Sequence, residues 1–86
     1  MKHATAAALD RIDALLQRLR DLEALKERTR GVFYRGSTAF LHFHEDPAGL
    51  FGDLKIGDRF ERFRVSTKAE RRQLLGMIRR ILGEPS

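Results

Sequence analysis

Three turn signals constrain the fold of this chain most, because they divide its middle third into short segments. The signals are Gly36-Ser37, Asp46-Pro47-Ala48-Gly49 and Gly57-Asp58. Glycine, proline and aspartate at such positions favour tight turns between antiparallel strands. The segments between them are rich in Phe, Leu, Val and Ile, which favour strands. We therefore predict a four-stranded antiparallel meander over residues 32–35, 38–44, 50–56 and 59–65.

A helical pattern precedes these strands. Between Ala8 and Leu22, apolar residues recur on one side of a helix at about 100° per residue, and most charges fall on the opposite side. Gly31 follows Arg28 and Arg30, and a glycine preceded by cations is typical of a helix end. The sequence therefore predicts one long first helix over residues 5–30.

A second helix is predicted after the last strand. Thr67 and Glu70 have the spacing of a capping box, and Gly83 and Pro85 follow the last apolar residues. This helix should cover residues 67–82. The chain has 86 residues, enough for one core. We expect a single α+β domain over residues 1–86, in the order α-β-β-β-β-α, with both long helices packed on one face of the sheet.

The compartment can also be inferred from composition. The chain has no cysteine, which excludes disulfides and thiolate metal sites and suits a reducing environment. Asp10 interrupts the apolar start before it reaches the length of a signal sequence, and no apolar run approaches a membrane span. We expect a cytoplasmic protein with no membrane association.

The turns also predict which residues face one another. Counting outward from them gives the pairs His44–Phe51, His42–Asp53, Asp53–Arg62, Phe51–Arg64 and Phe33–Phe40. Alternation along the strands then assigns to the core face Val32, Tyr34, Leu41, Phe43, Leu50, Leu54, Ile56, Phe63 and Val65. The opposite face, here called the predicted binding face, carries Phe33, Arg35, Phe40, His42, His44, Phe51, Asp53, Lys55, Phe60, Arg62 and Arg64.

The predicted binding face favours a small non-enzymatic binding module without a cofactor. Bases of single-stranded nucleic acid stack on aromatic rings, while Arg and Lys neutralise phosphates. Residues 59–86 carry eight basic and three acidic side chains, whereas residues 1–58 are balanced at nine of each. This asymmetry suggests an acidic partner, although a merely solubilising surface has the same composition. The second helix adds a basic edge formed by Lys68, Arg72 and Arg79.

Two alternatives to nucleic-acid binding remain open. Aromatic residues and Arg also favour protein interfaces, so the same face or the first helix could join two copies in a homodimer. His42, His44 and Asp53 could together hold a metal ion, although alternate residues on any strand share a face and the spacing alone is weak. For an enzyme we find no nucleophile, acid–base pair or phosphate loop with a supporting pattern.

The run FYRGSTAFLHFHEDPAGLFGDLKIGDRFERFRVSTKAERRQLL, residues 33–75, resembles small uncharacterised bacterial proteins. The resemblance covers roughly the last two thirds of the chain. It implies a bacterial cytosolic origin and brings no activity with it. The order of helices and strands is also similar to that of the MmcQ/YjbR-like group, but no motif matches residue by residue, and fold alone does not determine function.

Overall fold

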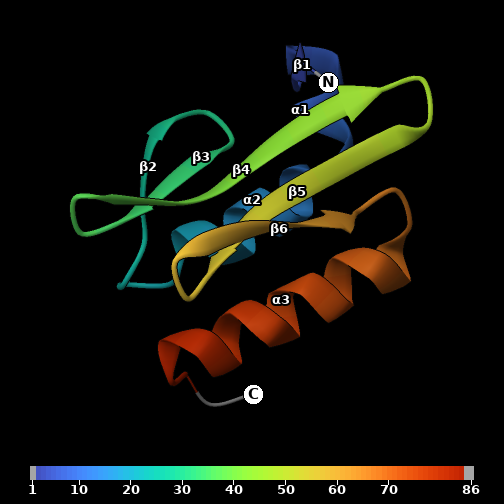
Figure 1. The fold of residues 1–86 in the computed structure, drawn as a ribbon. Coiled ribbons are helices and arrows are strands. Elements are labelled where there is room, and N and C mark those ends of the chain that lie inside the picture. The colour runs from blue at the N-terminus through green and yellow to red at the C-terminus, as the bar shows by residue number, and fades with distance from the viewer. Residues whose placement is uncertain (1, 85–86) are drawn as a thin grey trace.

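Both of the later predicted turns join antiparallel strands in the computed structural model, which describes residues 2–84 (Figure 1). Within that range the chain forms three helices, α1 (Ala6–Arg11), α2 (Asp13–Arg20) and α3 (Lys68–Leu82). It also forms six strands, β1 (Lys2–His3), β2 (Lys26–Thr29), β3 (Val32–Arg35), β4 (Thr38–Asp46), β5 (Gly49–Ile56) and β6 (Arg59–Arg64). All six belong to one antiparallel sheet in the order β2-β3-β4-β5-β6, with β1 paired to β4. The α+β class is confirmed, whereas the predicted count of four strands and two helices is wrong.

The long first helix is also wrong. The helix breaks at Ile12, whose φ of −111° and ψ of 21° separate α1 from α2, and α2 ends at Arg20. Leu22 and Leu25 remain buried, so the apolar pattern that suggested a helix continues through irregular backbone. Gly31 has a φ of 81° and forms the turn between β2 and β3 rather than a helix end. Between residues 2 and 84, none of the helices has the length and apolar character needed to cross a bilayer.

A β-bulge changes the register between β3 and β4. Phe33 pairs with Leu41 and Tyr34 pairs with Ala39, so that Phe40 is an extra residue on β4. The predicted pair Phe33–Phe40 is therefore wrong. Because side chains alternate along a strand, a shift of one residue exchanges the two faces of β3. Phe33 is 0% exposed and Phe40 is 3% exposed, and both lie in the core.

The remaining predicted pairs are confirmed. The structure contains His44–Phe51, His42–Asp53, Asp53–Arg62 and Phe51–Arg64. The predicted capping box is also present, because the Thr67 hydroxyl accepts a hydrogen bond from the Glu70 N–H and the Glu70 carboxylate accepts one from the Thr67 N–H. Gly83, with a φ of 74°, ends α3 in the left-handed conformation.

The helices cover one face of the sheet. Leu9 of α1 lies against Gly31, where a Cβ would come within 2.7 Å of its Cδ2 atom. Leu74 of α3 lies over Gly52, where a Cβ would come within 3.3 Å of Leu74 Cδ2 and 3.2 Å of Phe43 Cε1. The core between helices and sheet contains as its largest fully buried side chains Phe33, Phe43, Ile12, Leu16, Leu19, Leu41 and Leu54. The other side of the sheet, which carries no helix, is called the uncovered face below.

Candidate metal centre

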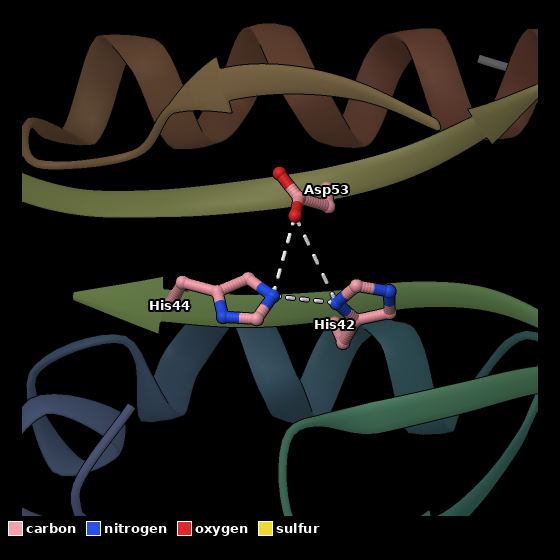
Figure 2. Close-up of side chains that lie close together, drawn as sticks. All are labelled: His42, His44 and Asp53. Atoms are coloured by element: carbon pink, nitrogen blue, oxygen red, sulfur yellow. Dashed lines mark hydrogen bonds and ion pairs between the residues drawn. The ribbon is translucent and has the colours of Figure 1, made fainter. Parts of the chain in front are cut away.

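Two histidines and one carboxylate converge on the uncovered face, on the side of the strands away from the helices (Figure 2). His42 and His44 are alternate residues of β4 and therefore share a face, and Asp53 of β5 pairs directly with His42. His42 Nδ1 lies 2.7 Å from His44 Nε2. Asp53 Oδ2 lies 3.2 Å from His44 Nε2 and 4.0 Å from His42 Nδ1. These three side chains thus direct one donor atom each toward a common point.

Arg62 of β6 holds the carboxylate of Asp53 from the other side. Arg62 Nε donates to Asp53 Oδ1 at 2.8 Å, and a terminal guanidinium nitrogen donates to Oδ2 at 3.1 Å. Burial acts to raise the pKa of Asp53, but these bonds, the charge of Arg62 and the nearby His44 and His42 together hold the pKa below its ordinary value. Asp53 is therefore an ionised carboxylate in a fixed orientation at neutral pH.

His42 lies in a partly desolvated position. Its ring packs at a centroid distance of 4.9 Å from Phe60 and 4.9 Å from His44. Burial is the largest effect on its pKa, and together with the charge of His44 it lowers the pKa below the ordinary histidine value, although Asp53 acts in the opposite direction. His42 is consequently a neutral imidazole at pH 7, with a lone pair on one ring nitrogen.

His44 lies between the cluster and the N-terminal strand. Its Nε2 atom faces Asp53, whereas its Nδ1 atom is buried and has no hydrogen-bond partner among the residues that the structure describes. His3 of β1 pairs with His44 across the strands, and the two ring centroids are 6.3 Å apart in an edge-to-face arrangement. His3 could not be assigned to the site from the sequence, because the two-residue strand β1 has no strand signal of its own.

The structure brings together only part of the predicted binding face. The buried Phe33 and Phe40 do not belong to it, and Arg35, which shares a face with Phe33, lies at the end of β3 away from it. The alternation of β5 and β6 places on the uncovered face, beside the His/Asp cluster, Phe51, Lys55, Phe60, Arg62 and Arg64. Among residues 2–84, the large hydrophobic side chain that is exposed is that of Phe60, at 41%. Its neighbour Lys55 places its Nζ atom 5.5 Å from the ring centroid.

The exchange of faces on β3 also adds to the uncovered face two residues that were predicted to lie in the core, Val32 and Tyr34. Val32 pairs with His42 and therefore lies on the uncovered face rather than in the predicted core. Tyr34 lies there too, and the guanidinium of Arg28 in β2 stacks 4.4 Å from the centre of its ring. The predicted basic edge of the second helix is divided, since Lys68 and Arg72 line a groove between α2 and α3 whereas Arg79 does not line it. That edge is not part of the uncovered face.

Comparison with family models, with curated protein sequences and with solved structures finds no significant match to this chain.

Proposed function

We propose that this protein binds a divalent metal ion such as zinc through His42, His44 and Asp53. The observation that supports this function is the convergence of three donor atoms from two adjacent strands, with mutual distances of 2.7, 3.2 and 4.0 Å. Imidazole nitrogen and carboxylate oxygen are ligands that zinc accepts in proteins, and three protein ligands leave a fourth position for water or a substrate.

The spacing of the donor atoms suits a tetrahedral ion. Metal–ligand distances of about 2.0–2.1 Å and tetrahedral angles require neighbouring donor atoms to be roughly 3.4 Å apart. The three distances found here lie on both sides of that value. Metal binding would therefore require the two imidazole nitrogens to move slightly apart and His42 Nδ1 to approach Asp53 Oδ2.

The protonation states also suit a cation. A metal ion competes with protons for its ligands, so neutral imidazole and ionised carboxylate favour binding at pH 7. The lowered pKa of His42, caused first by burial, and the lowered pKa of Asp53, which burial opposes and Arg62 produces, have this result. Arg62 acts as a positioning residue, because it orients the carboxylate through two hydrogen bonds while its own charge limits the affinity for a cation.

Titration of the metal-free protein with Zn²⁺ by calorimetry, and with Co²⁺ by absorption spectroscopy, tests this function. We expect one ion per chain and, for Co²⁺, the visible bands of tetrahedral coordination. His42→Gln and Asp53→Asn should each lower the affinity at least tenfold, in the range of losses expected when a site loses a ligand or its orienting partner. Asp58→Asn, the same change in an exposed turn, is the matched control and should leave the affinity unchanged. Equal affinity in all variants would refute the site.

Single-stranded nucleic acid is a second candidate ligand of the uncovered face. The observation in its favour is the exposed ring of Phe60, 41% accessible, with Lys55 paired to it across the strands and Arg62 two residues along β6 on the same face. A base can stack on this ring while the cations neutralise phosphates. The burial of Phe33 and Phe40 leaves fewer rings than the sequence predicted, so we expect a short site. Binding of a labelled oligonucleotide should weaken steeply with salt and should be reduced by Phe60→Ala.

A further inference from the structure

A second concave site lies on the helical side of the molecule and reaches the edge of the sheet at Arg64. A groove of about 270 Å³ runs between α2 and α3. Its floor is apolar and is formed by Ile12 and Leu15 from the first helical segments and by Leu75 from α3. Ala14, which is exposed, contributes a short side chain to the wall and leaves the groove open along its length. An apolar floor of this kind is able to accept a hydrocarbon group.

The rim of this groove is cationic. The charged side chains that line it are Arg11, Arg18, Lys68, Arg71 and Arg72. None of the residues lining the groove carries a carboxylate. Like charges placed around one cleft repel one another, and the resulting potential attracts anions. A ligand of this groove is therefore expected to carry negative charge as well as an apolar part.

A polar pocket of about 360 Å³ adjoins the groove, because Arg11 and Arg71 line both. Its other lining residues are Gly49, Leu50, Arg64 and Ser66. The Ser66 hydroxyl accepts a hydrogen bond from the Leu50 N–H at 3.1 Å, and an Arg71 terminal nitrogen donates to the Val65 carbonyl at 2.8 Å. These bonds hold the wall of the pocket in place, and three of the residues that line it are arginines. Guanidinium groups are the usual partners of carboxylate and phosphate oxygens.

The rim is distinguished by the number of cations around one cleft, because arginines of both kinds, with and without an ion pair, occur elsewhere in residues 2–84. Arg20 is paired with Glu27, Arg30 with Asp10, and Arg62 with Asp53. Within residues 2–84, the five cations on the rim have no ion pair with a carboxylate. Arg64 of the adjoining pocket is the exception, with Glu70 at 3.6 Å. The groove therefore offers unneutralised guanidinium groups next to an apolar floor.

We propose that the groove and its adjoining pocket bind a single-chain anionic amphiphile, a free medium-chain carboxylate. The carboxylate lies among Arg11, Arg64 and Arg71, and the hydrocarbon chain follows the apolar floor over Ile12, Leu15 and Leu75. This arrangement matches the charge of the ligand to the rim and its tail to the floor, with the two volumes joined at Arg11 and Arg71. The site is separate from the His/Asp cluster, so it does not depend on metal binding.

Calorimetric titration with carboxylates from hexanoate to decanoate, below the concentration at which micelles form, tests the proposal. We expect affinity to rise by up to about fourfold for each added methylene group, because each buried group contributes transfer free energy. Decanol, which has the tail without the charge, and acetate, which has the charge without the tail, should both bind at least tenfold more weakly than decanoate. Equal binding of acetate and decanoate would overturn the proposal.

Two variants locate the ligand. Arg11→Gln removes one headgroup partner and should lower the affinity for decanoate at least tenfold, whereas Arg80→Gln makes the same charge change on α3 outside the groove and should lower it less than twofold. Ala14→Phe fills the groove and should abolish the dependence on chain length. Thermal unfolding of each variant verifies that it is folded. Equal losses of affinity in the two Arg variants would overturn the proposal, and so would unchanged decanoate binding in Ala14→Phe. The proposal would also be overturned if an oligonucleotide displaced decanoate and Arg11→Gln left decanoate binding intact.

Discussion

The bulge on β4 predicts that two phenylalanines, both assigned to the predicted binding face from the sequence, contribute very differently to stability. Phe40 is 3% exposed and lies in the core, whereas Phe60 is 41% exposed on the uncovered face. Replacing a buried Phe by Ala costs about 3–5 kcal/mol, since it loses transfer free energy and leaves a cavity. Full burial of a Phe side chain is worth about 1.5–3 kcal/mol. Because Phe60 is only partly buried and water can fill its place, Phe60→Ala should cost about 1 kcal/mol.

The expected loss for Phe40→Ala is large for a chain of this size. A domain of 86 residues has a total stability of roughly 4–13 kcal/mol. Each 1 kcal/mol lowers the Tm by about 4–8 °C in domains of this length. Phe40→Ala should therefore lower the Tm by at least about 12 °C, or unfold the protein, and Phe60→Ala by less than about 8 °C. Circular dichroism during urea unfolding measures the loss of free energy in both variants, and during heating it measures their Tm. Similar costs for the two variants would place Phe40 on the uncovered face and refute the bulge.

Two further predictions concern single positions. Gly52→Ala should lower the free energy of unfolding in urea by about 1–3 kcal/mol, because its Cβ would lie 3.2 Å from Phe43 Cε1 in a packed core. Gly76→Ala in α3 meets only the end of a flexible side chain and should raise the free energy of unfolding by about 0.5–1 kcal/mol. Equal effects of the two substitutions would refute the packing of α3 on β5. Stability without metal should fall as the pH drops below about 6.5, because unfolded His42 takes up a proton near its ordinary pKa of 6.5 while burial holds the folded pKa lower. His42→Gln should flatten the stability curve between pH 5 and 7, and an unchanged slope would contradict the desolvation of His42.

The register of the last three strands, β4, β5 and β6, could be predicted from the sequence because short turns determine it. The turn that contains Asp46 and the turn at Gly57 leave little freedom in how β4, β5 and β6 align, so the pair His42–Asp53 followed by counting. The convergence of His44 on the same carboxylate then followed from alternation along β4. The distances, the orientation that Arg62 gives to Asp53 and the depth of burial required the structure.

The register of β3 could not be predicted in this way. The strand Val-Phe-Tyr-Arg carries a large apolar or aromatic residue on each face, so either alternation would place hydrophobic side chains in the core. The bulge at Phe40 decides between them, and it does so by inserting one more large side chain beneath the helices. Nothing in the local pattern distinguishes Phe33 from Tyr34 in this respect.

The N-terminal third deviates from its helical pattern because of long-range contacts. The strand β2 has the sequence Lys-Glu-Arg-Thr, which has no strand signal, and it forms because β3 offers its free edge. Glu27 stabilises the turn by accepting a hydrogen bond from the Gly31 N–H at 2.9 Å. Leu25, which a continuous helix would have included, instead lies buried where the chain crosses to the sheet. Such contacts join residues distant in sequence, and periodicity alone does not report them.

The composition of the two outer strands bears on how this protein behaves when it is concentrated. Three of the four residues of β2 and four of the six residues of β6 are charged. Outer strands have unpaired backbone groups that could recruit a second chain, and like charges brought opposite one another oppose such pairing. Two β6 strands aligned antiparallel along their full length would place Arg59 of each chain opposite Arg64 of the other. The charged residues of β2 and β6 therefore oppose edge-to-edge addition of the sheets of separate molecules, the kind of strand pairing from which fibrils grow.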